Sequence, residues 1–241
     1  MHLLIDNSNT LTKFALDLGG ELSEWRDVIA TSDLSKTSIQ NTLNSQTFER
    51  ITLCSVVPDS TILIKTIFDQ PIHHISHQSK MPITIDYPNP SKIGADRLAN
   101  ASAAILDRQG PAIVIDFGTA VTFDVISKIG SYLGGVIAPG TASLRDYLHQ
   151  KTALLPAIQL EEPNSIIGRS TEEAMQVGAV IGYRGLIREI LSELRRELGG
   201  TPTILATGGD AELIGKGISD IDIIDQDLTM KGIQVIGQAN H

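Results

Sequence analysis

The feature that most constrains the fold of this chain is a sequence pattern that occurs once in each half. A short apolar run that ends in a carboxylate, Leu3-Leu4-Ile5-Asp6, returns as Ile113-Val114-Ile115-Asp116. In each half a buried strand, an Asp, a tight turn, a second strand and a Gly follow in the same order. One fixed offset matches four residue types: Ile5 with Ile115, Asp6 with Asp116, Thr12 with Thr122, and Gly20 with Gly130. A repeat at about half the chain length predicts two similar lobes.

Strands and helices mix in both halves, which predicts an α/β fold. Strands are expected at 3–5, 12–17, 22–29 and 51–57, and again at 112–116, 121–126, 131–137, 203–206 and 221–224. Apolar residues at helical spacing predict helices over 97–107 and 171–198, the second opened by a capping box of Ser170 and Glu173. The junction expected at Arg108-Gln109-Gly110-Pro111 separates an N-terminal lobe, 1–108, from a C-terminal lobe, 109–241.

Charge and composition exclude several classes of function. The net charge of −9 argues against nucleic-acid binding, because such proteins need a basic surface to displace phosphate counterions. No stretch is apolar enough to predict a membrane helix, and the first residues do not resemble a secretion signal. The protein is therefore expected in the cytoplasm, without a membrane partner. The single cysteine, Cys54, lies in an apolar run and is interpreted as a core residue.

Two turns after buried strands suggest phosphate binding. The first is Asp6-Asn7-Ser8-Asn9-Thr10, with Lys13 close behind, and the second is Asp116-Phe117-Gly118-Thr119-Ala120. Small residues let backbone N–H groups approach phosphate oxygens, and a carboxylate at a strand end can orient Mg²⁺. Each turn alone could be an ordinary hairpin. Because they occupy repeat-related positions, the pair favours the actin and sugar-kinase architecture, in which two hairpins hold the β- and γ-phosphates.

Two further segments are interpreted as a loop that contacts adenosine and a loop that contacts the substrate. A predicted strand leads into Thr207-Gly208-Gly209, where the backbone can pass close to a nucleoside. In the segment Gly94-Ala95-Asp96-Arg97, Asp96 could accept a hydroxyl proton, and Arg97 could form a bidentate pair with a carboxylate or phosphate. The alternative interpretation of the second segment is a plain helix start with an acidic first turn.

Together these segments resemble the type III pantothenate kinases. The resemblance extends in order from residue 6 to residue 210, and it includes the following segments: Tyr87 with Gly94–Arg97, Asp116–Ala120, Tyr132–Gly140, Gly168–Gly178 and Thr207–Gly209. It implies two duplicated lobes of the ribonuclease H type, each a mixed sheet flanked by helices, as in actin-like ATPases. It also implies a homodimer, for which the apolar stripe of 171–198 is a candidate interface, although core packing is expected to use most of that stripe.

The resemblance implies transfer of the ATP γ-phosphoryl group to pantothenate, the first step toward coenzyme A. Asp96 matches the proton acceptor, Asp6 the residue that orients Mg²⁺ through water, and Asp116 the ligand of a monovalent cation (K⁺ or NH₄⁺). ATP contacts match Asp6, Asn7, Ser8, Asn9, Thr10, Leu11, Thr12, Lys13 and Thr119. Pantothenate contacts match Tyr87, Gly94, Ala95, Asp96, Arg97 and Thr171, and the last begins a long helix whose free N–H groups favour an anion.

One position departs from the family pattern, and two other functions stay open. Ser8 stands where the family usually has Gly, and it would strain a backbone that needs positive φ. The alternatives are another small-molecule kinase of the superfamily and a catalytically weak homologue with a regulatory or accessory role. His73, His74 and His77 raise the idea of a metal site, but without a nearby Cys or carboxylate their spacing matches no ligand pattern.

Overall fold

The computed structural model describes residues 1–106 and 110–241, and the chain divides into two compact units. The first comprises Met1–Arg108, Gly130–Tyr132 and Asp227–His241, and the second comprises Gln109–Ile129 and Leu133–Gln226. Two of the four residues of the predicted junction, Arg108 and Gln109, lie outside the described residues, so the division into lobes at that point stays a prediction. Among the described residues, no helix has the length and apolar character needed to span a membrane.

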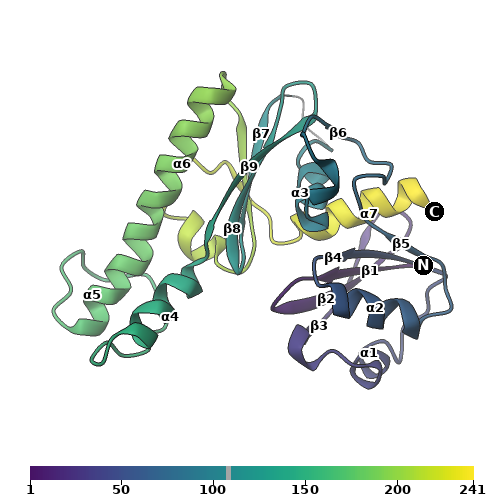
Figure 1. Cartoon of the computed structure of the whole chain (residues 1–241), viewed down its shortest axis with the longest axis horizontal. Helices are drawn as coiled ribbons and strands as arrows, with labels where there is room; N and C mark the ends of the chain where they lie inside the picture. Colours follow the sequence, from purple (N-terminus) through teal and green to yellow (C-terminus); the bar gives the residue numbers. More distant parts are fainter. Residues whose placement is uncertain (107–109) are drawn as a thin grey trace. The chain divides into compact units, whose positions relative to one another are not determined.

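The first unit is built on a mixed five-stranded sheet in the order β3-β2-β1-β4-β5 (Figure 1). Its strands are β1 (His2–Asn7), β2 (Leu11–Asp17), β3 (Leu22–Ala30), β4 (Arg50–Ser55) and β5 (Ile72–His74). Strands β1, β2 and β3 pair antiparallel, whereas β4 and β5 continue the sheet in parallel from β1. The parallel connection needs a crossover, which is the general reason for helices in this part of the chain.

Helices cover both faces of this sheet. α1 (Lys36–Thr42) and α2 (Pro58–Ile67) lie on one face, and α3 (Ala95–Ala104) and α7 (Leu228–Asn240) lie on the other (Figure 1). Because side chains alternate along a strand, Leu3 and Ile5 enter the core under α1 and α2, while His2 faces α7. Short 3-10 turns at Thr31–Asp33 and Pro90–Lys92 and the two-residue strand β6 (Thr84–Ile85) complete the unit.

The second unit repeats this plan. Its strands are β7 (Ala112–Phe117), β8 (Ala120–Ile126), β9 (Ser131–Pro139), β10 (Thr203–Thr207) and β11 (Ile223–Ile224). They lie in the order β9-β8-β7-β10-β11, and β6 extends this sheet as a sixth strand beside the first residues of β9. β7 pairs antiparallel with β8 and parallel with β10, as β1 does with β2 and β4. The predicted duplication of an α/β lobe is therefore confirmed at the level of strand order and direction.

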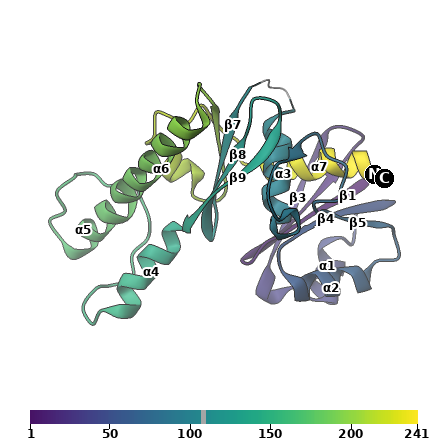
Figure 2. The ribbon, with the colours of Figure 1, turned by 45° about the horizontal axis from the view of Figure 1, so that its top comes forward.

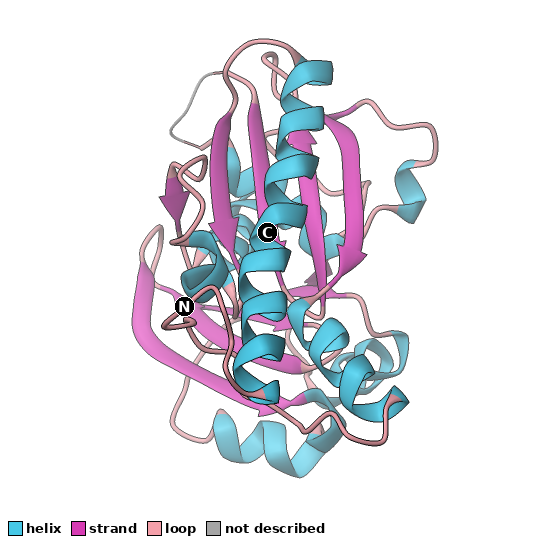
Figure 3. Cartoon of the chain, turned by 90° about the vertical axis from the view of Figure 1, so that its left-hand side faces the viewer, coloured by secondary structure: helices cyan, strands magenta, loops and turns pink. Residues whose placement is uncertain are grey.

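Most helical residues of the second unit belong to one long, continuous helical segment and to one shorter helix. α5 (Thr171–Val177), a π-helical turn (Gly178–Gly182) and α6 (Tyr183–Leu198) run on continuously, and α6 crosses the face of the sheet (Figure 3). Ile187 and Leu191 bury their side chains against strand residues of β7, β8 and β10. α4 (Thr141–Lys151) follows β9, and a second π-helical turn covers Ala211–Gly215. Figure 2 gives another view of α4 and α5.

The structure corrects the offset of the repeat. Asp6 pairs with Lys13 across the first hairpin, but Asp116 pairs with Thr122 across the second. The equivalent of Thr12 is therefore Val121 and not Thr122, and the next strands begin at Leu22 and Ser131, so Gly20 corresponds to Ile129 and not to Gly130. Two of the four matches were therefore coincidences. The physical reason is turn length, because the first hairpin holds one residue more between its strands.

Candidate active site

The first hairpin joins β1 to β2 and carries most of the residues expected at the ATP phosphates. Asp6 is 7% exposed at the end of β1, and Asn7 pairs with Thr12 in the next register position. The Ser8 N–H donates to the Leu11 carbonyl at 3.0 Å, so that the exposed residues Asn9 and Thr10 form the tip. The exposed tip is thus a place where an anionic group could approach the backbone.

A network of polar side chains holds this hairpin from behind. It consists of Asn7, Thr12, Thr31, Ser55 and Thr61. The side-chain amide nitrogen of Asn7 donates to the Thr12 hydroxyl at 2.7 Å, and the Ser55 hydroxyl donates to the side-chain oxygen Oδ1 of Asn7 at 2.7 Å. Thr31 donates to the Ser8 carbonyl at 2.8 Å, and Thr61 donates to Ser55 at 2.7 Å. Sequence reasoning missed Thr31, Ser55 and Thr61, because single hydroxyls on separate elements leave no local pattern.

Ser8 does not strain the hairpin. Among the described residues, no residue other than glycine has positive φ, so Ser8 adopts an ordinary backbone conformation. Its hydroxyl donates to the Leu11 carbonyl at 2.9 Å and adds a second bond to the one that its N–H makes. The concern that serine costs free energy at this position therefore does not apply to this chain.

The second hairpin joins β7 to β8 and is shorter. Asp116 is half-buried, and the Gly118 N–H donates to the Ala120 carbonyl at 3.2 Å. Gly118 and Thr119 are exposed at the tip. The two hairpins thus present a carboxylate at the strand end and an exposed tip with a hydroxyl, each within its own unit.

Two glycines from other loops pack against the second hairpin. A Cβ on Gly208 would lie 2.6 Å from Asp116 Oδ1 and 2.6 Å from the Phe117 carbonyl oxygen, and its φ is +95°. A Cβ on Gly140 would overlap the Thr119 carbonyl oxygen, to which the Gly140 N–H donates at 3.2 Å. The Thr207-Gly208-Gly209 loop therefore needs glycine at 208 to reach the hairpin.

A further contact closes this arrangement. The Thr141 hydroxyl, at the start of α4, donates to the Asp210 carboxylate, and the Asp210 N–H donates to the Phe117 carbonyl at 3.3 Å. The ends of β7, β9 and β10 therefore meet around one turn of the second unit.

Asp96 lies in the first turn of α3, where Gly94 is the residue that precedes the helix. A Cβ at Gly94 would overlap Asp96 Oδ1, so glycine makes room for the carboxylate. The same oxygen accepts a hydrogen bond from the Arg97 N–H at 2.8 Å. Burial raises the pKa of Asp96 above its ordinary value, and the Arg97 N–H and charge oppose this rise only in part. A carboxyl group with a raised pKa is a better proton acceptor than an ordinary one.

The segment that precedes this helix start carries Tyr87. The Tyr87 ring meets the Tyr132 ring edge-on, with centroids 6.2 Å apart, and the Arg97 guanidinium lies over the Tyr132 ring at 5.8 Å. The first unit therefore contains Asp6 to Lys13 on its hairpin, and it links Tyr87 to Arg97 through the Tyr132 ring. The second unit holds Asp116, Thr119 and Thr171.

Comparison with known proteins decides the family. The profile of the type III pantothenate kinase family matches residues 2–193. A type III pantothenate kinase from Akkermansia muciniphila is 49% identical over 239 residues, which cover 99% of both chains. The chain belongs to the type III pantothenate kinase family.

Solved structures support the fold of this family member. A Campylobacter jejuni protein assigned to the Baf family of transcriptional activators has a TM-score of 0.64 at 21% identity, over 97% of this chain and 96% of the other. The activator of 2-hydroxyisocaproyl-CoA dehydratase from Clostridium difficile, solved with ADPNP, has a TM-score of 0.54 at 13% identity, over 99% and 92% of the two chains. At these identities the likeness extends to the duplicated actin-like fold.

Thr171, the last substrate residue implied by the pantothenate kinase resemblance, begins α5. It lines a cavity of about 920 Å³ in the second unit, together with Ser170, Arg169 and Met175. The predicted capping box is half correct. Ser170 accepts the Glu173 N–H at 3.1 Å, but the Glu173 carboxylate accepts the N–H of Arg169 and not that of Ser170. The hydrogen bond to the Glu173 carboxylate therefore holds Arg169, the residue before the N-cap.

Two histidines of the cluster singled out in this pantothenate kinase chain contact residues outside these loops. His73 is 2.8 Å from the Ser79 hydroxyl, and His74 is 3.4 Å from the Lys65 ammonium. Within residues 1–106 and 110–241, no group of three or more His, Cys, Asp or Glu side chains is arranged to hold a metal ion. Cys54 is buried in β4.

Proposed function

We propose that the chain transfers the γ-phosphoryl group of ATP to the primary hydroxyl of pantothenate and forms 4′-phosphopantothenate, the first step of coenzyme A biosynthesis. The observation that carries the proposal is the half-buried Asp96 at the start of α3, in a chain that belongs to the type III pantothenate kinase family. Arg97 follows it directly and supplies a cation at the same place.

The chemical role of Asp96 follows from its surroundings. The pantothenate oxygen forms a bond to the γ-phosphorus, the bond from that phosphorus to the bridging oxygen of ADP breaks, and the hydroxyl proton passes to the Asp96 carboxylate. Because the transition state of phosphoryl transfer is loose, the proton leaves late, and orientation of the hydroxyl matters more than basicity. The raised pKa of Asp96 nevertheless favours transfer of the hydroxyl proton to its carboxylate once the pantothenate oxygen has bonded to phosphorus.

The two hairpins would hold the nucleotide. ATP contacts are assigned to residues 6–13 of the first hairpin and to Thr119 of the second. Mg²⁺ usually keeps several waters and binds one or two carboxylates together with phosphates, and Asp6, nearly buried at a strand end, fits that role through water. Bound Mg²⁺ would neutralise charge on the phosphates.

A monovalent cation, K⁺ or NH₄⁺, is assigned to Asp116. A carboxylate suits such an ion because hard cations take oxygen ligands, and Asp116 lies half-buried near the end of β7. The second hairpin would then contribute charge compensation beside the phosphates, in a protein whose net charge of −9 otherwise repels them.

Contacts with pantothenate are proposed for Tyr87, for Gly94 to Arg97 and for Thr171. Tyr87 and Gly94 to Arg97 belong to the first unit, and Thr171 belongs to the second unit, where it lies at the N-terminus of the long helix. The Arg97 guanidinium and the helix N-terminus are both suited to the substrate carboxylate.

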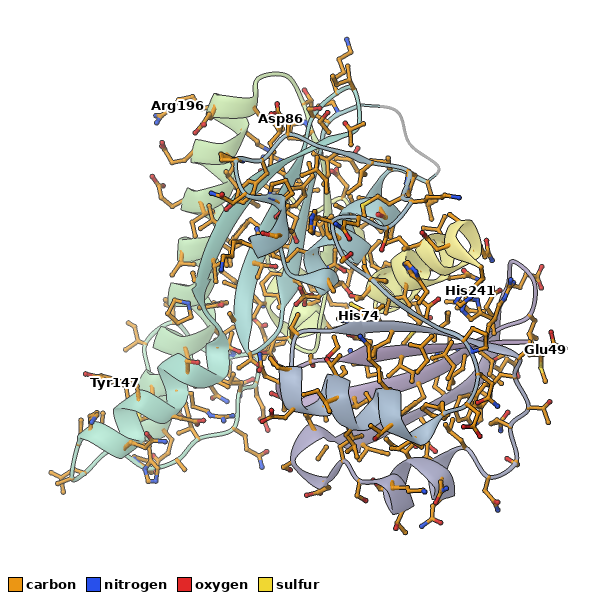
Figure 4. The ribbon with its side chains drawn as sticks, turned by 45° about the vertical axis from the view of Figure 1, so that its right-hand side comes forward. Glu49, His74, Asp86, Tyr147, Arg196 and His241 are labelled. Atoms are coloured by element: carbon orange, nitrogen blue, oxygen red, sulfur yellow. The ribbon has the colours of Figure 1, made fainter. Side chains whose placement is uncertain are left out.

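We further infer a homodimer. The surface of the second unit carries several large apolar side chains on α4 and the loop that follows it, among them Tyr147 (Figure 4), Leu154, Ile166 and Ile167, which are 61%, 90%, 65% and 72% exposed. Exposed apolar residues on one region support a protein interface, and a second copy of the chain is the partner that the family resemblance favours. Sedimentation of the full chain checks this inference.

The test of the proposed reaction is ADP release in a coupled assay with ATP, Mg²⁺ and pantothenate, with K⁺ present or replaced by Na⁺. We expect turnover that depends on pantothenate and on K⁺, and that falls by at least 100-fold in Asp96→Asn. The Asn variant keeps the size of the side chain, so its thermal stability is the matched control for folding. Turnover of other alcohols, and not of pantothenate, would indicate another kinase. A folded dimer that binds ATP without turnover would indicate a regulatory homologue.

A further inference from the structure

Tyr132 stands out because it lies far in the sequence from the segments that it contacts. It is fully buried at 0% exposure and belongs to the first unit with its neighbours Gly130 and Ser131. Its backbone forms a parallel strand pair with Ile85, and its carbonyl accepts the Asp86 N–H at 3.0 Å. Asp86 (Figure 4) directly precedes Tyr87. The start of β9 thus fixes the backbone from which the Tyr87 side chain projects.

The Tyr132 ring makes two contacts with residues assigned to pantothenate. The Arg97 Cζ lies over the ring, 5.8 Å from its centroid, within the range of a cation–π interaction. The Tyr87 ring meets it at an interplanar angle of 65°, with centroids 6.2 Å apart, which is a favourable edge-to-face geometry. One buried ring therefore supports both the cation and the aromatic side chain.

We propose that Tyr132 is a positioning residue that holds the Arg97 guanidinium, and through Tyr87 the substrate loop, in place for the carboxylate end of the substrate. This inference rests on the proposed function. An arginine side chain loses considerable rotamer freedom when it binds an anion, and a guanidinium already held over a ring loses less on binding. A guanidinium carries its N–H donors in its own plane, so attraction of its charge to a ring is compatible with pairing to a carboxylate.

The consequence differs from that of an ordinary core residue. Loss of packing alone lowers stability and affects ATP and pantothenate alike. Loss of the electrostatic contact between ring and guanidinium affects pantothenate binding and leaves ATP binding unchanged, because Arg97 is assigned to the substrate and not to the nucleotide. A series of isosteric rings separates the two cases.

In the experiment, Tyr132→Phe is compared with variants that carry mono-, di- and trifluorinated phenylalanine at position 132. Fluorine withdraws electron density from the ring face and weakens cation–π attraction with little change in shape. We expect the KM for pantothenate to rise stepwise with fluorination, by about tenfold across the series, with the KM for ATP and kcat within twofold. The same series at Phe48, whose ring packs against Phe68 and not against a cation, is the matched control and is expected to leave both KM values unchanged.

The series is repeated in an Arg97→Ala background, where the dependence on fluorination should vanish. A flat pantothenate KM across the series with Arg97 present would overturn the proposal, and so would a slope that persists without Arg97. A wild-type chain that does not turn over pantothenate at all contradicts the proposed function itself, and the positioning role with it. Turnover with a flat series contradicts only the role of Tyr132.

Discussion

The two hairpins occupy equivalent places in two sheets of the same topology, yet they are supported by different means. The first is supported by side chains, since Asn7 is held between Thr12 and Ser55 at 2.7 Å each. The second is supported by backbone, since Gly140 and Gly208 approach it more closely than any Cβ would allow. Duplication has therefore preserved strand order while each copy acquired its own way of fixing a turn.

The difference predicts how each hairpin responds to change. A hydrogen bond between side chains contributes about 1 kcal/mol net and can be lost singly. Substitution of a glycine that packs against backbone does not have a graded effect, because an added methyl group either fits or forces the loop apart. The second hairpin should therefore fail abruptly and the first by degrees.

The largest effect is expected for Gly208→Ala. The added methyl group would lie 2.6 Å from Asp116 Oδ1, at a φ of +95° that alanine disfavours. We expect a loss of kcat/KM for ATP on the order of 100-fold and a drop in stability of about 3 kcal/mol. Gly209→Ala is the control for stability, because a Cβ there meets no atom within 4 Å. Equal melting temperatures for the two variants would show that Gly208 does not support the hairpin.

As the pH is lowered, the sheet that carries the first hairpin should lose stability at a higher pH than the sheet that carries the second. Five of the six histidines lie in the first unit: His2, His73, His74, His77 and His241. Burial, followed by His241 and Arg50, lowers the pKa of His2 from 6.5 to about 4, although Asp17 at 3.8 Å opposes this shift.

The direction of this pH effect follows from proton binding. Between pH 6.5 and about 4 the unfolded chain binds the proton that folded His2 refuses, so stability falls as pH falls through this window, by roughly 3 kcal/mol. Hydrogen exchange at stepped pH should show earlier loss of protection in β1 than in β7. His2→Gln should reduce that difference, and equal loss in both strands with wild type would contradict it.

A moderate effect is expected for Thr12→Val. The change keeps the shape but removes the hydroxyl that accepts the Asn7 amide and lies 3.1 Å from the Thr31 hydroxyl. We expect a loss of about 1–2 kcal/mol in the free energy of unfolding and a small rise in the KM for ATP. A double-mutant cycle with Asn7→Ala measures the coupling. Strictly additive changes would mean that the two side chains do not act together.

The smallest effect is expected for Ser8→Gly. Since Ser8 does not have positive φ, restoring the family glycine relieves no strain, and it removes one bond to the Leu11 carbonyl. We expect the KM for ATP to change by less than about threefold and stability to fall slightly, by about 0.5–1 kcal/mol. An activity gain of tenfold or more would mean that the serine hinders the phosphate loop after all.

Sequence reasoning succeeded where a local pattern reflects a local cause. An apolar run that ends in an Asp predicted β1 and β7, and their repetition predicted two sheets of one topology, which the structure confirms. It failed on turn length, since the one-residue difference between the hairpins is visible only in the strand register. It did not single out α2, α4 and α7, whose apolar positions are few or interrupted by glycine and polar residues.

The support of the sites could not be predicted for a related reason. Thr31 and Ser55 reach the first hairpin from elements 23 and 48 residues away, and an isolated hydroxyl does not reveal its partner. The close approach of Gly208 to Asp116 depends on the parallel pairing of β10 with β7, which no residue type specifies. The assigned ligand roles of Asp6, Asp96, Asp116 and Thr171 stay predictions.

The most direct test of the central claim is phosphorus NMR of wild-type protein with equimolar ATP and pantothenate in Mg²⁺ and K⁺. The account predicts a new phosphomonoester signal, split by two methylene protons, that grows at the same rate as ADP. Growth of inorganic phosphate without the ester, or no loss of ATP, would contradict phosphoryl transfer to pantothenate.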